Sequence, residues 1–182
     1  IDRWTIFGGS WGSTLSLSYA IKYPERCTEL MLRGIFLLRK KELNWFYQEG
    51  ASNIFPDAWS YYLAPIKKEK RHNMMAAYYE ILTGDDIEKR YAAAKAWSIW
   101  EASTSKLIPS KKSLHHFDKD EVADIFARIE CHYFVNKGFF EYDGWILDKI
   151  DLIGHIPCVI IQGRYDVVCP IETAWDLHLK WP

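Results

Sequence analysis

The sequence predicts an α/β fold in which a parallel β-sheet is interrupted by a long, all-helical insertion. Short apolar runs typical of buried strands occur near both ends of the chain, each followed by a helical pattern. Between them, β-branched residues become scarce, and Ala, Lys, Glu, Tyr and Trp recur with helical spacing. We therefore expect sheet residues at 1–37 and 143–182, and a helical domain at 38–142.

The first element is an apolar run at residues 1–7, which ends in a glycine-rich segment at 8–12. Residues 13–23 then follow a helical pattern, and Pro24 ends it. A second apolar run at 28–32 completes a strand–helix–strand unit. Such a unit places its two strands in one parallel sheet.

The insertion contains four segments with helical character, at residues 44–47, 58–62, 73–82 and 88–102. Turn-forming residues at 84–86 and 108–110 separate such segments. Beyond the insertion, Pro157 precedes an apolar strand-like run at 158–162, and Pro170 opens a further helix. The sheet is thus expected to resume after the insertion.

Composition excludes several classes of partner. The chain has 23 Lys and Arg against 24 Asp and Glu, so no net charge favours nucleic acid or an anionic membrane. No apolar stretch is long enough for a membrane span. The four cysteines show no metal-ligand or disulfide spacing, so they indicate neither a zinc site nor a disulfide framework and predict reduced thiols in a cytoplasmic protein. No cofactor is expected. Oligomeric state stays open.

Both ends of the chain suggest that the fold continues outside these 182 residues. Residues 4–7 look like a buried parallel strand, which needs neighbours for its backbone hydrogen bonds. At the other end, the chain stops directly after an apparent amphipathic helix, at Lys180-Trp181-Pro182. No charged-then-apolar leader peptide opens the chain, but this absence is weak evidence about targeting because the chain does not begin with Met.

The segment Gly8-Gly9-Ser10-Trp11-Gly12 matches the pattern G-x-S-x-G between a predicted strand and a predicted helix. This context is that of the nucleophile elbow of α/β-hydrolases, in which the serine is held in a strained turn. Side chains at the flanking glycines are expected to collide with the strand and helix. The Trp11 backbone N–H would then supply half of an oxyanion hole. A plain glycine-rich turn is the alternative.

A serine nucleophile needs a histidine base and an acid that orients it, in the chain order serine, acid, histidine. Asp166 follows the strand-like run at 158–162 and fits the acid, although it could instead be a turn-forming residue that caps the next helix. None of the six histidines suits the base, because of their positions along the chain: His72, His115, His116, His132, His155 and His178. We expect the base beyond Pro182 and a second oxyanion donor before Ile1, so this chain alone should be inactive.

Six segments together resemble proline iminopeptidases (prolyl aminopeptidases). They are residues 8–15, 32–36, 45–51, 97–101, 129–134 and 163–166. The serine motif is shared with lipases and esterases, but its combination with Trp-Ser-x-Trp-Glu and Glu-x-His-Tyr-Phe is specific. The resemblance implies an α/β-hydrolase core with a helical cap, and a metal-independent enzyme that releases N-terminal proline from peptides.

The resemblance also implies roles for single residues. Glu101 and Glu130 match carboxylates that hold the cationic N-terminus of the substrate, which charge-assisted hydrogen bonds favour in a covered cleft. Phe36 matches an aromatic wall of the proline pocket, and Cys169 matches another pocket position. On the residues alone, a Glu on a Trp-rich helix is more often solvated or salt-bridged than in contact with substrate, and Phe36 would be assigned to the core.

The sequence departs from that family where Cys131 replaces the usual Asn, and it lacks the glycine-rich oxyanion loop and the terminal histidine motif. Other functions remain open. The chain could be an esterase or a broader aminopeptidase with the same core, or a noncatalytic α/β-hydrolase-fold protein that binds a ligand or partner. Dehalogenase and epoxide-hydrolase chemistry is disfavoured because those enzymes carry Asp at the elbow.

Overall fold

The computed structural model describes residues 1–106, 108 and 119–182. It divides into two compact units, unit 1 with Ile1–Glu42 and Phe140–Pro182, and unit 2 with Leu43–Phe139. Both boundaries expected from the sequence, after residues 37 and 142, lie inside unit 1. Each unit has its own core.

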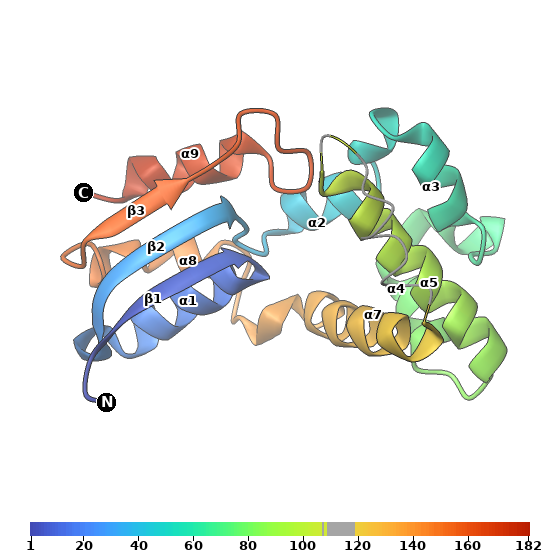
Figure 1. Cartoon of the computed structure of the whole chain (residues 1–182), viewed down its shortest axis with the longest axis horizontal. Coiled ribbons are helices and arrows are strands. Elements are labelled where there is room, and N and C mark those ends of the chain that lie inside the picture. The colour runs from blue at the N-terminus through green and yellow to red at the C-terminus, as the bar shows by residue number, and fades with distance from the viewer. Residues whose placement is uncertain (107, 109–118) are drawn as a thin grey trace. The chain divides into compact units, whose positions relative to one another are not determined.

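Unit 1 contains a three-stranded parallel sheet in the order β1 (Trp4–Ser10), β2 (Cys27–Ile35) and β3 (Cys158–Ile161) (Figure 1). The predicted parallel sheet is confirmed. The first strand is longer than predicted, because Gly8 and Gly9 still pair with Leu32 and Arg33 of β2. Three of the five residues of the glycine-rich segment, Gly8, Gly9 and Ser10, therefore belong to the strand and not to a turn.

One face of the sheet is covered by α1 (Trp11–Lys22), α8 (Trp145–Asp148) and α9 (Ile171–Lys180). Two single 3₁₀ turns, Pro24–Arg26 and Ile150–Leu152, connect these elements. Apolar side chains from the strands and helices form one cluster, with members such as Leu17, Leu30, Leu32, Ile146 and Leu177. Leu30 and Leu32 lie two residues apart in β2, and this spacing puts both on the covered face.

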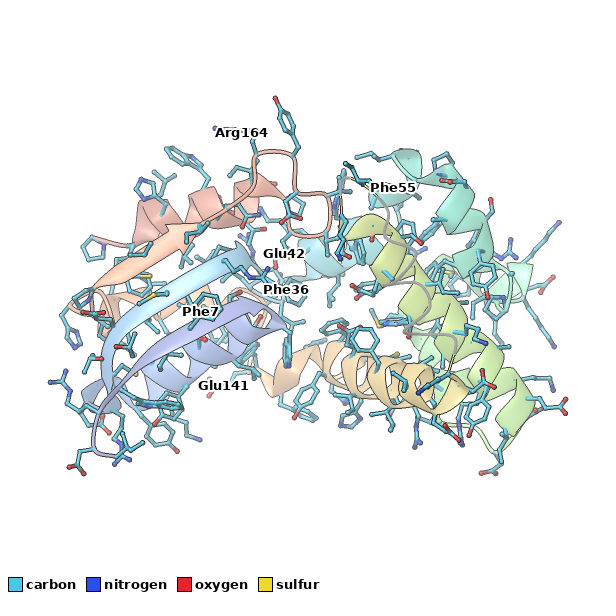
Figure 2. All side chains as sticks on the ribbon, viewed as in Figure 1. Phe7, Phe36, Glu42, Phe55, Glu141 and Arg164 are labelled. Carbon is cyan, nitrogen blue, oxygen red and sulfur yellow. The ribbon has the colours of Figure 1, made fainter. Side chains whose placement is uncertain are left out.

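The opposite face of the sheet presents apolar side chains that are exposed in this structure. Phe7, Met31, Val159 and Ile161 have exposed fractions between 40% and 67%, and Phe7 is labelled in Figure 2. These residues alternate with buried residues in β1 and β2 and with half-buried ones in β3. Sheets made only of parallel strands are normally covered on both faces, so this face is unusual among such sheets.

A buried charge network fastens the segment after β2 to α9 within unit 1. Arg39 donates from Nε to Glu42 Oε1 and from Nη1 to Asp176 Oδ2, the latter at 2.7 Å. Glu42 Oε2 accepts the backbone N–H of Leu37 at 2.8 Å. Because Arg39 and Glu42 are buried, loss of either partner would leave an uncompensated charge in the interior. The network fixes the chain directly after Phe36.

The described part of unit 2 is helical and contains no strand. Its helices are α3 (Pro56–Leu63), α4 (Met74–Leu82), α5 (Ile87–Thr104) and α7 (Asp120–Val135), with 3₁₀ turns at Ala51–Asn53, Lys68–Asn73 and Lys137–Phe139. Helix α2 (Lys40–Tyr47) contains the boundary between the units. The predicted segments at 44–47, 58–62, 73–82 and 88–102 coincide with α2, α3, α4 and α5.

Aromatic packing forms the core of unit 2. Tyr62, Tyr78, Trp97 and Trp100 are fully buried, and the Tyr62 and Tyr78 rings stack with centroids 4.7 Å apart. The predicted break at residues 84–86 separates α4 from α5, where the Asp86 carboxylate caps α5 by accepting the Lys89 N–H. The other predicted break, at 108–110, lies mostly outside the described residues.

Candidate active site

Ser10 ends β1, and α1 begins at the next residue. Its backbone has φ 54° and ψ −125°, a left-handed region that residues with a Cβ rarely adopt. The Ser10 side chain is exposed. A strained backbone that presents an exposed hydroxyl between a strand and a helix is the local geometry of a nucleophile elbow.

The two glycines that flank Ser10 in the motif have different surroundings. A Cβ at Gly8 would lie 2.7 Å from the Gly12 carbonyl carbon, and so would collide with the first turn of α1. A Cβ at Gly12 would meet no described atom within 4 Å. The expectation that both positions exclude a side chain is therefore wrong for Gly12, because a Cβ there would have open space among the described residues.

Two hydroxyls at the start of α1 join the elbow to the segment after β2. Ser13 Oγ donates to the Ser10 carbonyl at 2.7 Å and accepts the Phe36 N–H at 3.0 Å. Thr14 Oγ1 donates to the Phe36 carbonyl at 2.6 Å. Both hydroxyl residues are fully buried. The backbone of Phe36 is thereby fixed against the helix that follows Ser10.

Phe36 itself is half-buried and lies just beyond the end of β2 (Figure 2). Its ring centroid is 6.5 Å from that of Trp11. Trp11 is the first residue of α1, and the N–H groups of a first helical turn have no acceptor within their own helix. Both residues thus lie in unit 1 close to Ser10, the position that their expected roles require.

Asp166 lies on the loop after β3. Ser10 and this loop are both at the end of the sheet that is formed by the carboxyl ends of the strands. A Cβ added at Gly34 would be 3.8 Å from Ser10 N and 4.0 Å from Asp166 Oδ2, so both groups border the same glycine. Gly34 has φ 52° and forms a bulge, since Gly9 pairs with Arg33 but Ser10 pairs with Ile35. The bulge brings the carboxyl ends of all three strands together around Ser10 and Asp166.

The Asp166 carboxylate is held by two donors. Oδ1 accepts the backbone N–H of Cys169 at 2.9 Å, and Oδ2 accepts from Gln162 Nε2 at 3.2 Å. The Cys169 bond closes a turn, but it does not cap α9, whose N-cap is Pro170. Of the two interpretations of Asp166, the helix-capping one is therefore wrong. Cys169 is buried and lies beside the candidate acid.

Neither histidine of unit 1 lies at this end of the sheet. His155 precedes β3, so it is at the amino end of the strand whose carboxyl end leads to Asp166. His178 lies in the last turn of α9, which runs back along the sheet away from the loop of Asp166 (Figure 1). His72 and His132 belong to unit 2. His115 and His116 lie outside the described residues.

In unit 2, Glu101 of α5 and Glu130 of α7 form an acidic pair with Tyr47 and Trp97. The Tyr47 hydroxyl donates to Glu101 Oε1, and Trp97 Nε1 donates to Glu130 Oε2 at 2.9 Å. The Tyr47 and Trp97 rings stack with centroids 4.5 Å apart. Both glutamates are half-buried by exposed area. The sequence did not single out Tyr47 or Trp97 as partners of these carboxylates.

Burial perturbs both carboxyl groups. Desolvation raises the pKa of Glu101 to about 7, against the opposing effect of the Tyr47 hydrogen bond. Desolvation and then the charge of Glu101 raise the pKa of Glu130 well above its ordinary value. The hydrogen-bond partners found for these carboxylates among the described residues are neutral. An acidic pair of this kind is electrostatically suited to a cation.

Neither a metal site nor a membrane span is formed by the described residues. They contain no cluster of three or more His, Cys, Asp or Glu side chains arranged to hold a metal ion. In the same part of the chain, every helix is too short or too polar to cross a membrane.

Comparison with known proteins places this arrangement in a family. A family model described as the alpha/beta hydrolase fold matches residues 1–182, and so covers the strand, elbow and acid loop together. The chain belongs to the α/β-hydrolase family. The fold predicted from the elbow motif and its context is thereby confirmed.

This α/β hydrolase is similar over its whole length to curated proteins. It is 62% identical over 182 residues to a probable proline iminopeptidase of Leptolyngbya boryana, and covers 57% of that protein. It is 55% identical to a proline iminopeptidase of Xylella fastidiosa (strain Temecula1), covering 58%, and 51% identical over 183 residues to one of Arabidopsis thaliana, covering 48%. The resemblance drawn from the motifs is thus confirmed, and the chain spans about half the length of these relatives.

Proposed function

We propose that the chain is the part of a serine aminopeptidase that carries the nucleophile and the triad acid, and that the enzyme releases N-terminal proline from peptides. The strained, exposed Ser10 beside Asp166 supports the serine mechanism. The names of relatives at 51–62% identity support proline as the substrate residue. The base and a second oxyanion donor are expected from residues outside this chain.

The proposed reaction is acyl transfer in two steps. Ser10 Oγ attacks the carbonyl of the N-terminal proline while its proton passes to the histidine base, and the peptide leaves with that proton at its new amine. Water then attacks the prolyl ester, returns a proton to Ser10 Oγ through the same base, and releases proline. The Trp11 N–H is the proposed donor to the oxyanion that forms in each step.

Glu101 and Glu130 are the proposed receptors of the substrate's cationic imino group. Protonated proline offers two N–H donors, and a pair of carboxylates supplies acceptors for both. The absence of any cationic partner for the two carboxylates among the described residues supports this role. Phe36 and Cys169 are the proposed lining of the pocket for the apolar proline ring.

The decisive experiment compares wild type with Ser10→Ala in the full-length gene product. Ser10→Ala should abolish cleavage of proline anilide while leaving the thermal unfolding midpoint unchanged, because it removes one exposed oxygen and no core volume. Ser18→Ala is a matched control, since its hydroxyl bonds within α1, to the Thr14 carbonyl at 2.7 Å. Turnover retained by Ser10→Ala would contradict the mechanism.

The same assay tests the substrate with the wild-type enzyme. Free proline anilide should be cleaved, whereas N-acetylproline anilide, which lacks the cationic nitrogen, should be a far poorer substrate. Short acyl esters serve as the third arm. Hydrolysis of esters without cleavage of proline anilide would replace the aminopeptidase by an esterase on the same core, and equal cleavage of the acetylated anilide would remove amine recognition.

A further inference from the structure

Gln162 lies directly after β3 and connects three segments of unit 1 through its side-chain amide. Its Oε1 accepts the backbone N–H of Ile35 at 2.7 Å. Its Nε2 donates to the Cys169 carbonyl at 2.7 Å and to Asp166 Oδ2 at 3.2 Å. The residue is half-buried. One amide thus joins the end of β2 to both sides of the loop that carries the candidate acid.

The backbone partners determine which way this amide points. Ile35 N–H can only donate and the Cys169 carbonyl can only accept, so Oε1 must face β2 and Nε2 must face the loop. The remaining N–H of Nε2 is then directed to Asp166. The orientation is therefore set by hydrogen bonds that do not involve Asp166 at all.

These hydrogen bonds determine which acceptor positions of the Asp166 carboxylate are occupied. Asp166 Oδ1 is occupied by the Cys169 N–H, and Gln162 takes one position on Oδ2. Oδ2 is also the oxygen that borders Gly34 and, through it, Ser10. With both oxygens fixed, the carboxylate keeps one rotamer, and an acceptor position on Oδ2 remains for a histidine.

We propose that Gln162 is a positioning residue of the triad, which sets the orientation of Asp166 toward the histidine base and ties it to the Gly34 bulge next to Ser10. The inference rests on the proposed serine mechanism. It extends that mechanism by assigning a role to a residue that makes no contact with substrate. A positioning role predicts a change in kcat and in the pH profile, with little change in KM.

The test uses Gln162→Glu in the full-length gene product with proline anilide as substrate. The new carboxylate keeps the acceptor for Ile35 N–H, but it replaces the donor to Asp166 by a second negative charge. Because extra negative charge favours the protonated imidazole, the acidic limb of kcat/KM should move to higher pH by about half a unit or more. The kcat should fall about tenfold, with KM changed less than about twofold.

Gln48→Glu is the matched control. Gln48 is also half-buried and also bridges two backbone groups, donating to the Arg71 carbonyl and accepting the Met74 N–H, both at 2.9 Å, within unit 2. The same change of charge at this bridge should leave the acidic limb in place. Both variants replace an amide that bridges two backbone groups. The thermal unfolding midpoint of each variant therefore measures the loss of stability that this replacement causes.

Gln162→Met is the second variant, in case the added charge prevents folding. It removes the three hydrogen bonds without a new charge, so kcat should fall while the acidic limb moves less than in Gln162→Glu. An unchanged kcat in both folded variants, with turnover abolished by Ser10→Ala, would overturn the role of Gln162 and leave the serine mechanism standing. Turnover retained by Ser10→Ala would overturn both.

Discussion

At the scale of single residues, three glycines near Ser10 are subject to different constraints. A Cβ at Gly8 would strike the first turn of α1, Gly34 has φ 52° between Ser10 and Asp166, and a Cβ at Gly12 would meet no described atom within 4 Å. A steric collision, a backbone conformation and an open position are distinct physical conditions. They predict three different results for the same substitution by alanine.

Gly8→Ala should be the most damaging, by at least about 3 kcal/mol, because backbone atoms of α1 would have to move. Gly34→Ala should cost about 1 kcal/mol, since its Cβ has room but its positive φ disfavours any side chain. Gly12→Ala, inside α1, should be neutral or stabilise by about 0.5 kcal/mol. Urea unfolding of the full-length gene product measures all three.

Gly8 and Gly12 belong to the same G-x-S-x-G motif, so a difference between their alanine variants would come from local packing and not from the motif. If Gly12→Ala were as damaging as Gly8→Ala, atoms outside the described residues would have to occupy the space beside Gly12. Equal, small effects at Gly8 and Gly34 would show that α1 can move away from β1. The second result would contradict the assignment of Gly8 as the position where strand and helix approach most closely.

At the scale of elements, sequence patterns predicted the types of the strands and of helices α1 to α5, because hydrophobic period and turn residues are local properties. They predicted the ends of these strands and helices less well. Gly8 and Gly9 belong to β1 because β2 continues to pair with them, and pairing between strands is not visible in either strand alone. Helix α8 was missed, since its four residues are too few for a periodic pattern. Helix α7 was expected only as part of the helical insertion and not as a segment of its own.

The candidate site shows the same limit. Ser10 and Asp166 could be picked out because their motifs are contiguous. Ser13 and Gln162 could not, because their partners at Phe36 and Ile35 are distant in the chain. Tyr47 and Trp97 resembled ordinary core aromatics, and only their hydrogen bonds to Glu101 and Glu130 distinguish them. Side-chain partners across elements depend on tertiary packing, which no local pattern contains.

The acidic pair predicts a pH dependence for the stability of unit 2. Glu101 has an ordinary pKa of 4.5, raised to about 7 in the fold by burial. The folded state therefore binds more protons than the unfolded state between these values, so unfolding free energy should fall as pH rises from about 4.5 through 7. Below that window this contribution to stability is fully present. Glu130 is shifted in the same direction.

Glu101→Gln should flatten this dependence, because the amide keeps the shape of the side chain and cannot ionise. The measurement is urea unfolding at pH 4.5 and pH 8, followed by far-ultraviolet circular dichroism, to which the helical unit 2 contributes strongly. Glu88→Gln on the same helix is the control, since Glu88 is exposed. A wild-type midpoint that rises between the two pH values, with the rise lost in Glu101→Gln, would reverse the predicted sign.

At the scale of the whole molecule, each proposed activity draws on a different unit. Unit 1 holds the proposed nucleophile and the proposed acid on a sheet with its own apolar core. Unit 2 holds the acidic pair within an aromatic core. Separate cores allow the residues for bond cleavage and for amine recognition to be altered independently, so variants in one unit need not unfold the other.

The base of the triad gives the last prediction. His155 is exposed before the amino end of β3, and His178 is exposed in the last turn of α9, where its ring packs against Trp175 at 5.2 Å. Both positions are at the end of the sheet where the strands begin, whereas Asp166 is at the end where they finish. His155→Ala and His178→Ala should therefore each keep kcat for proline anilide within about twofold of wild type in the full-length gene product.

A complementary experiment assays residues 1–182 expressed alone. This chain should not cleave proline anilide, because a serine and an acid without a general base retain only a small part of triad catalysis. If either histidine variant abolished turnover, or if residues 1–182 alone cleaved the substrate at the rate of the full-length product, the base would lie within this chain. If the full-length product cleaved neither proline anilide nor the short acyl esters, the noncatalytic binding protein would become the better interpretation of the fold.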